Sequence, residues 1–444
     1  MRKKYQSLFF SIVLWGSGQF FVKKERIKGL LLFLSQITLF GIELITGYWL
    51  NLFAGQIEHF SIRLYGGFFT KGIWGLFTLG EVQGAAGDNS TILMVKGIIA
   101  FIILVGFAVV YVYNLYDSLM PSIYLPDKDV GLKKTSRAKA KRKMFPYLVL
   151  SPSLIIIIFV VLMPIVFSIL TAFTNYDTKH QPPANLIDWV GFDNFVKLVR
   201  VPVWSKTFGV VLIWNVIWAL AATLSTFFMG LLQAMMLNSK YVKHKSFFQT
   251  IYILPWAIPG MISLLVFRNL LNGQFSPVNQ ILLNAGLISE RIPFLTNPVL
   301  AKICIIGVNL WMGFPTFMVM ILGVLSNQDV SLYEAAQIDG ANRMQVFAHI
   351  KLPLLMRAMS PLLVMNLAGN FNNFGAIYFL TSGGPTNPKL QFAGDTDILI
   401  SWIYKLTLNQ RMYSMAAVMN ILIFIFIAAV SIWNFSRTNA FQEI

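Results

Sequence analysis

Charged side chains are scarce in this chain of 444 residues: they make up 12%, compared with about 25% in ordinary soluble domains. Hydrophobic residues account for 56%, and the mean hydropathy is +0.66. This composition excludes an ordinary soluble domain. It predicts a polytopic membrane protein of the all-α class, because a helix satisfies its own backbone hydrogen bonds in lipid.

Residues and motifs for catalysis are also missing. The single cysteine, Cys304, excludes an intrachain disulfide. The four histidines (His59, His180, His244 and His349) are scattered and lack the spacing of metal ligands. Neither the phosphate-binding sequence G-x4-G-K-[ST] nor the nucleophile elbow G-x-S-x-G occurs. We therefore expect no catalytic residue, metal or cofactor in this chain, and its energy must come from a gradient or from another subunit.

Long apolar runs predict the membrane-spanning helices. A span needs about 20 predominantly apolar residues. Eight runs qualify, at roughly 28–50, 93–116, 146–173, 208–237, 247–271, 300–325, 356–381 and 417–438. The run 8–22 is too short and contains glycine, so we expect a re-entrant or interfacial hairpin, with a ninth span as the alternative. The sequence thus predicts about eight transmembrane helices.

Lysine and arginine predict the orientation. With both termini in the cytoplasm, most of the 35 basic residues fall on the cytoplasmic side, as the positive-inside rule requires. The densest cluster lies at 128–143, directly before the third span. The net charge of +17 is therefore explained by topology and by contact with anionic membrane lipid, not by binding to nucleic acid.

Three regions follow from this arrangement. Residues 1–145 form an N-terminal membrane region, which ends in the basic cytoplasmic segment 117–145. Residues 146–207 hold the third span and an external segment. Residues 208–444 form a membrane core with a cytoplasmic loop at 326–355. Four external segments are not expected to form separate folded domains: 51–92, 174–207, 272–299 and 382–416.

The cytoplasmic segment 334–353 is amphipathic, unlike its apolar neighbours. Its sequence, EAAQIDGANRMQVFAHIKLP, predicts two short helices separated by the turn signal Asp339-Gly340. The apolar faces of these helices are formed by Ala335, Ala336, Ile338, Phe347 and Ile350. Pro353 is expected to end the second helix. So small a helical hairpin cannot bury its own apolar face, so it either folds onto the membrane surface or docks into another protein.

The seventh run carries three asparagines, Asn366, Asn370 and Asn373, whose spacings of four and three predict one helical face. Unpaired amides are costly in hydrocarbon, so this stripe is expected to face the bundle interior or a wet cavity. An amide offers two donors and an acceptor, which suits sugar hydroxyls. Hydrogen bonds between helices, worth about 0.6–2 kcal/mol each, are the alternative role.

Two further runs contain helix-breaking residues. Residues 254–260 hold two prolines and a glycine, and residues 309–315 hold another glycine and proline, so both spans are expected to be broken and to line a cavity. Aromatic faces for stacking on pyranose rings, or for ordinary packing, are offered by Trp256, Trp311, Phe371 and Phe374. These segments hold no charged residue, which favours a neutral, hydroxyl-rich solute.

Acidic residues keep two other functional classes open. A gradient-driven transporter would use a carboxylate in the membrane. The candidate is Glu43, whose side chain is expected to extend toward the membrane surface. A polytopic enzyme, such as a lipid-linked glycosyltransferase, would need an external acidic pair. Asp395 and Asp397 are the best candidates, although solvated charges in an exposed loop explain them more simply.

The segment 334–353 resembles the EAA loop of ABC-importer permeases, E-A-A-x-x-D-G-A followed by x5-F-x2-I-x-L-P. The matching positions are Glu334, Ala335, Ala336, Asp339, Gly340, Ala341, Phe347, Ile350, Leu352 and Pro353. The phrases V-N-x-W-x-G-F-P (308–315), G-N-F-N-N-F (369–374) and L-T-x-G-G-P (380–385) resemble permeases of the MalF type, from maltose/maltodextrin importers. The resemblance implies a type I ABC importer permease core in the cytoplasmic membrane of a prokaryote. Maltose/maltodextrin-type oligosaccharides are the implied cargo, with another neutral oligosaccharide as the alternative.

The same resemblance implies partners and a sugar site. The partners are a second permease of MalG type, an extracellular sugar-binding protein, and a dimer of ATPase subunits that binds ATP and Mg and receives the EAA loop. In that family the fifth, sixth and seventh spans contact the sugar. Carried over by position, these contacts fall on Trp256, Gly260, Asn309, Met312, Gly313, Thr316, Asn366, Gly369, Asn370 and Asn373. Asn309, Gly313, Asn370 and Asn373 match the family's residue, and differences at the other positions are expected to shift specificity among oligosaccharides.

Overall fold

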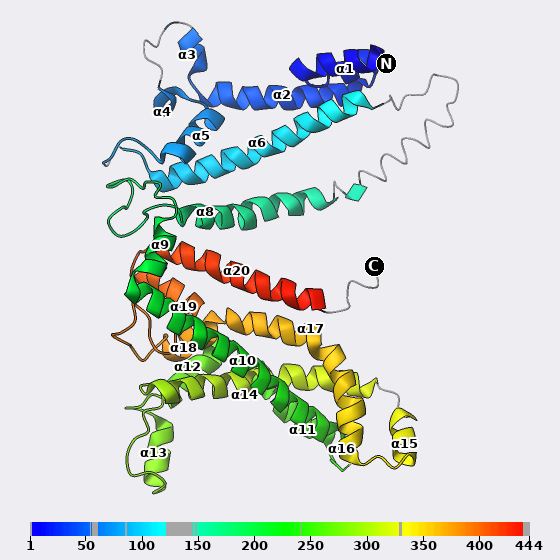
Figure 1. Ribbon diagram of the computed structural model, residues 1–444, viewed down its shortest axis with the longest axis vertical. Coiled ribbons are helices and arrows are strands. Elements are labelled where there is room, and N and C mark those ends of the chain that lie inside the picture. The colour runs from blue at the N-terminus through cyan, green and yellow to red at the C-terminus, as the bar shows by residue number, and fades with distance from the viewer. Residues whose placement is uncertain are drawn as a thin grey trace. The chain divides into compact units, whose positions relative to one another are not determined.

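The structure is a computed structural model (Figure 1), and it describes residues 2–53, 55, 61–84, 87–120, 145–146, 149–239, 241–327 and 331–437. Within these ranges the regular structure is helical, and β-pairing is limited to the isolated bridges Thr174–Trp189 and Thr386–Gly394. The chain falls into an N-terminal unit, Met1–Asn194, and a C-terminal unit, Phe195–Ile444. The basic cluster predicted at 128–143 lies outside the described residues.

The N-terminal unit contains three long apolar helices and several short ones. Its elements are α1 (Arg2–Val13), α2 (Arg26–Thr46), α3 (Trp49–Phe53), α4 (Ile62–Tyr65), α5 (Phe68–Thr78), α6 (Ser90–Leu119) and α8 (Met163–Thr171), which ends the apolar helix Val149–Thr171. A π-helical turn at Gly18–Val22 packs against both α1 and α2. The run 8–22 thus folds as a hairpin, which turns at Gly16 with a positive φ of 78°. Its depth in the membrane stays a prediction.

Glu43 is hydrogen-bonded to other residues of the N-terminal unit. Its carboxylate accepts hydrogen bonds from the backbone N–H groups of Phe69 (2.8 Å) and Thr70 (3.3 Å), from the Thr70 hydroxyl, and from the Trp49 indole (3.1 Å). The first two donors lie at the start of α5, where backbone N–H groups have no partner within the helix and a carboxylate is favourable. These contacts were not predicted, because α5 lies in the segment 51–92, where no helix was expected. Whether Glu43 extends toward the membrane surface stays a prediction.

The C-terminal unit is built from α10 (Pro202–Asn238), α11 (Lys245–Ile253), α12 (Gly260–Leu270), α13 (Pro277–Asn284), α14 (Pro298–Ser326), α15 (Ser331–Ile338), α16 (Arg343–Val346), α17 (Leu352–Phe371), α18 (Phe374–Thr381), α19 (Leu399–Tyr404) and α20 (Tyr413–Arg437); α9 (Asp193–Arg200) crosses the boundary between the units. Within this unit, α13 and α15 lie at opposite ends of the long helices (Figure 1).

Six helices in the described ranges are long and apolar enough to cross a membrane: Arg26–Thr46, Ser90–Leu119, Val149–Thr171, Pro202–Asn238, Pro298–Ser326 and Arg343–Phe371. A seventh span is formed if Lys245–Ala257 and Gly260–Leu270, which meet at a bend of 88°, cross together. The eighth predicted run falls on α20, whose apolar part Tyr413–Ala429 is shorter. The all-α membrane architecture is confirmed, and the orientation of the termini stays a prediction.

Of the two predicted interruptions one is confirmed and one is wrong, and a third span has a break that was not predicted. The bend at 254–260 is confirmed. By contrast, α14 continues through Pro315, because a single proline removes only one helical hydrogen bond and tight packing on α10 holds the helix together. This packing is possible at Gly230, where a side chain would lie 2.6 Å from Phe317 Cβ and 2.9 Å from Phe314 O. The run 356–381, expected to be one helix, is broken at Asn372.

Replacing Glu43 with glutamine tests the role of its carboxylate. Glu43→Gln keeps the side-chain shape, but its amide has one uncharged acceptor oxygen. In the wild type the same donors share the two charged oxygens of the carboxylate. We expect a loss of about 1–2 kcal/mol in the free energy of unfolding, measured by denaturation of the purified protein in detergent. Glu81→Gln, at an exposed position in the same unit, is the control and should change little. Equal stability of the two variants would contradict the structural role.

Candidate functional site

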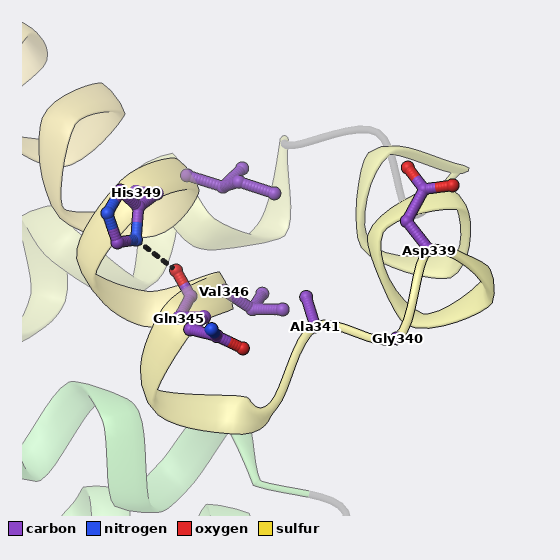
Figure 2. A pocket seen from close by; sticks show the side chains of 7 residues that line it. Asp339, Gly340, Ala341, Gln345, Val346 and His349 are labelled. Carbon is purple, nitrogen blue, oxygen red and sulfur yellow. Dashed lines mark hydrogen bonds between the residues drawn. The ribbon is translucent and has the colours of Figure 1, made fainter.

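The hairpin 334–353 forms the predicted pair of helices, α15 and α16, around the turn at Gly340 (Figure 2). Gly340 has a φ of +82°, its N–H donates to Gln337 O (3.1 Å), and the N–H of Ala341 donates to Ala336 O (2.9 Å). This pair of bonds is the Schellman motif, which glycine favours because it needs a left-handed residue. The prediction of a helix-ending turn is confirmed.

A capping box starts the second helix directly after that turn. The Asn342 side chain accepts from the N–H of Gln345 (2.9 Å), and the Gln345 side chain accepts from the N–H of Asn342 (2.8 Å). His349 then bonds to Gln345 O at 3.1 Å (Figure 2). Between the two helices lies a pocket of about 330 Å³, lined by Asp339, Gly340, Ala341, Gln345, Val346, His349 and Ile350.

Pro353 does not end the second helix, contrary to expectation. A π-helical turn at Phe347–Lys351 joins α16 to α17, so the helix runs from Arg343 to Phe371. A proline ring clashes with the carbonyl four residues before it in an α-helix, and the wider π turn relieves this clash. The hairpin is therefore continuous with the seventh span.

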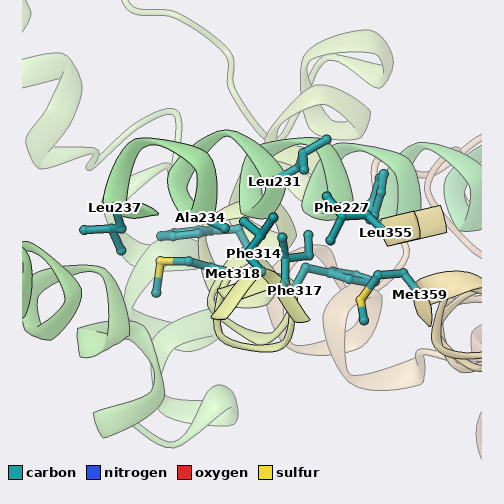
Figure 3. Close-up of a cluster of buried hydrophobic side chains, with 11 residues drawn as sticks. Phe227, Leu231, Ala234, Leu237, Phe314, Phe317, Met318, Leu355 and Met359 are labelled. Carbon is teal, nitrogen blue, oxygen red and sulfur yellow. The ribbon is translucent and has the colours of Figure 1, made fainter. Parts of the chain in front are cut away.

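The apolar residues of the hairpin divide between two surroundings. Phe347 and Leu352 pack against a buried cluster formed by α10, α14 and α17 (Figure 3), which contains Phe227, Leu231, Ala234, Leu237, Phe314, Phe317, Met318, Ile321, Leu325, Leu355 and Met359. By contrast, Ile338 is 87% exposed and Met344 is 71% exposed. The first set attaches the hairpin to the membrane core, and the second leaves an apolar surface uncovered.

The break between α17 and α18 is the second functional feature. Where α17 ends, the carbonyls of Asn370 and Phe371 accept hydrogen bonds from α10: Trp218 donates to Asn370 O (2.9 Å) and Asn215 donates to Phe371 O (3.0 Å). Asn215 also accepts from the N–H of Leu399 (2.8 Å). Each of these backbone groups would cost several kcal/mol if left unpaired in lipid, so α10 makes the break possible.

The three predicted asparagines lie together at this break. The amide nitrogen of Asn370 donates to Asn366 Oδ1 (2.8 Å) and to Thr223 Oγ1 of α10 (3.0 Å), and Asn373 donates to Asn370 Oδ1 (3.4 Å). Contrary to expectation, Asn373 does not lie on the same helix but caps α18 by accepting from the N–H of Ala376 (3.1 Å). The stripe is therefore a hydrogen-bonded chain, and part of its polarity is used between helices.

The remaining predicted sugar-contact residues lie against α14, against α10 or beside open space. A side chain at Gly260 would lie 3.1 Å from Met312 Cε, and one at Gly313 would lie 2.8 Å from Thr226 Cγ2. Trp256, in the short 3-10 turn Leu254–Ala257, is 51% exposed, and this turn contacts α14. A methyl group at Gly369 would meet no described atom within 4 Å, so space is open beside it.

Two polar side chains of the predicted set keep their hydrogen-bonding capacity. Within the described ranges, no hydrogen bond involves the amide of Asn309 or the hydroxyl of Thr316. The aromatic rings are used differently: Trp311 packs edge-on against Phe267 (5.3 Å between ring centres), and Phe371 stacks on Phe426 (5.3 Å). The structure thus assigns packing contacts to these two rings.

The contribution of α10 was not predicted from the sequence. Asn215, Trp218 and Thr223 supply every side-chain bond from α10 to α17 described above, and Trp214 donates to Thr396 O (3.1 Å). A signal was present, because these polar and indole-bearing residues recur at helical spacing within the apolar run 208–237. Their partners lie more than 140 positions away, and no local pattern identifies such pairs.

Asp397 is fully buried, so the expectation of a solvated charge in an exposed loop was wrong. It pairs with Lys405 and accepts hydrogen bonds from Ser401 Oγ (2.8 Å) and from the N–H of Gly394 (2.7 Å). Burial raises the pKa of the Asp397 carboxyl, and Lys405 opposes this rise. Asp395 instead accepts from Asn387 at 2.8 Å. The pair Asp395 and Asp397 thus has a structural explanation, in which the ordered segment 382–412 is held together around one buried charge.

Comparisons with known proteins agree with the helical membrane architecture of the chain. The family described as binding-protein-dependent transport system inner membrane component matches residues 226–437. The chain is 38% identical to the galactooligosaccharides transport system permease protein GanP of Bacillus subtilis, over 100% of both chains, and 36% identical to the maltodextrin transport system permease protein MdxF of that organism, over 88% of this chain and 89% of MdxF. A bacterial alginate ABC transporter, solved in complex with an alginate pentasaccharide-bound periplasmic protein, is 26% identical with a TM-score of 0.55, over 67% of this chain and 94% of that chain.

The turn of the hairpin 334–353 can be tested at Gly340. Gly340→Val places a β-branched residue at a φ of +82°, which such residues rarely adopt, so the hairpin should lose its shape. We expect uptake of the transported solute to fall by about tenfold or more while the amount of protein in the membrane is unchanged. Gly209→Val, on α10 with open space around it, is the control. Normal uptake by Gly340→Val would contradict a role for this turn.

The buried charge of Asp397 in the segment 382–412 can be tested separately. Asp397→Asn leaves Lys405 without its counter-charge in a largely buried place, so we expect a loss of about 3 kcal/mol in the free energy of unfolding. Asp395→Asn, two residues away and partly exposed, should cost less than about 1 kcal/mol. Thermal denaturation in detergent measures both variants. If they were equally stable, the ion pair would not organise the segment.

Proposed function

Because the chain belongs to the family of binding-protein-dependent transport system inner membrane components, we propose that it is the permease subunit that imports a neutral oligosaccharide of the maltodextrin type. The observation that carries this proposal is the helix break between α17 and α18, where uncharged amides gather inside an apolar helix bundle. Amides both donate and accept hydrogen bonds, as sugar hydroxyls do.

The proposed sugar site consists of residues from three spans that meet at α10. Trp256 and Gly260 come from the bend before α12, Asn309, Met312, Gly313 and Thr316 from α14, and Asn366, Gly369, Asn370 and Asn373 from the break after α17. None of these side chains is charged, so the site suits a neutral solute. The unpaired amide of Asn309 and the exposed ring of Trp256 supply a polar contact and a stacking surface.

The cytoplasmic hairpin is the proposed contact with a dimer of ATPase subunits, which bind ATP and Mg. Support comes from the exposed Ile338 and Met344, which leave apolar surface for a partner, and from the absence of a phosphate-binding loop in the sequence. Since Arg343–Phe371 is one continuous helix, movement of the docked hairpin moves the end of α17 that carries the asparagines. A second permease of MalG type and an extracellular sugar-binding protein complete the proposed complex.

A galacto-oligosaccharide is the second candidate substrate. The relative named for galactooligosaccharides aligns over the whole chain at 38% identity, slightly above the maltodextrin relative at 36%. Both kinds of sugar are neutral and rich in hydroxyl groups, so the amides at the break suit either.

Uptake by the whole complex tests the proposal. The chain is reconstituted in liposomes with its second permease, its ATPase subunits and its binding protein, and uptake of labelled maltotriose is compared with uptake of labelled galactotriose. We expect ATP-dependent uptake of maltotriose that an ionophore leaves unchanged. Preference for galactotriose would select the second candidate. Uptake that needs an ion gradient and no ATP would contradict the proposed mechanism.

A further inference from the structure

Thr223 of α10 lies beside the proposed sugar site without belonging to it. Its side chain is 3% exposed, and its Oγ1 accepts a hydrogen bond of 3.0 Å from the amide nitrogen of Asn370, which is itself 7% exposed. Thr223 therefore joins α10 to α17 at the point where α17 ends.

The bonds around Asn370 account for its whole amide group. Its two N–H donors are used by Thr223 Oγ1 and by Asn366 Oδ1, and its oxygen accepts from Asn373. If the amide were turned over, its oxygen would face Asn366 Oδ1, and its nitrogen would face the donating nitrogen of Asn373. With Asn366 and Asn373 in their present orientations both contacts would be repulsive, so the Asn370 amide takes the orientation in which Thr223 Oγ1 accepts its second N–H.

This orientation decides which groups remain for a ligand. Asn366 uses its oxygen toward Asn370, while its amide nitrogen takes part in no hydrogen bond within the described ranges. Asn366 therefore keeps two N–H donors, whereas Asn370 keeps none. A hydroxyl, ring or glycosidic oxygen of a sugar can accept from Asn366.

We infer that Thr223 is a positioning residue for substrate selection: by accepting from Asn370, it holds the chain of asparagines in the orientation in which Asn366 presents donors to the sugar. This inference rests on the proposed function. Without the Thr223 hydroxyl, one N–H of Asn370 is unpaired in a buried place, and the amides rearrange to satisfy it. Asn366 then presents a different set of donors and acceptors.

The experiment compares three variants of Thr223 in the reconstituted complex, with whichever of labelled maltotriose or galactotriose the wild type imports. Thr223→Val keeps the shape and removes the acceptor, and we expect the KM for uptake to rise about 5- to 10-fold with the maximal rate within about twofold. Thr223→Ser restores the hydroxyl and should restore the KM. Thr223→Ala is used if the valine variant does not assemble, with the same expected rise.

Ser225→Ala is the matched control. It removes a hydroxyl from the same turn of α10, one that donates only to the backbone oxygen of Ala222 (3.3 Å), and its KM should equal that of the wild type. Three results would overturn the inference while leaving the proposed function intact: an unchanged KM in Thr223→Val or Thr223→Ala, a fall in their maximal rate alone, or an equal rise of the KM in Ser225→Ala. Failure of the wild type to import either sugar would overturn both.

Discussion

The need to pair every backbone group inside lipid governs the C-terminal unit. A helix that stops within a membrane exposes carbonyl and N–H groups that water cannot reach, and each costs several kcal/mol if unpaired. At the end of α17 these groups are satisfied from α10, by the side chains of Trp218 and Asn215. The break with its cluster of amides can exist because α10 lies beside it, and the proposed sugar site depends on that contact.

The same helix relates the break to the hairpin 334–353. Toward the hairpin, α10 packs with α14 and α17 in the apolar cluster around Phe317, against which Phe347 also packs. Near the break, Trp214 and Trp218 pack in a second cluster with residues of α12, α14 and α18. Because α17 is continuous with α16, a displacement of the hairpin is carried along one unbroken helix rather than through a loop. This continuity gives a physical route between the proposed ATPase contact and the proposed sugar site.

Local sequence signals were sufficient for some parts of the site and not for others. The turn at Gly340 was predictable because a glycine that follows a helical stretch satisfies a local geometric need. The bend at 254–260 was predictable because two prolines remove two backbone donors within a few residues. Pro315 and Pro353 were misjudged because close packing on α10 and a π turn compensate for a single proline. The hydrogen bonds of Glu43 were missed, and Asp397 was misjudged, because their partners come from segments in which no structure was predicted.

The sequence by itself determined that this is a helical membrane protein, where its main apolar helices lie, and which segment forms the hairpin of the EAA type. These properties follow from composition and from patterns over a few turns, where each residue acts through its neighbours in the chain. Only the tertiary structure decided that α17 stops at Phe371, that Asn370 is bound by Thr223, and that the amide of Asn366 keeps its donors. Thr223 and Asn370 are more than 140 positions apart, and the orientation of Asn366 depends on their bond. Such hydrogen bonds arise when helices pack and not from any local pattern.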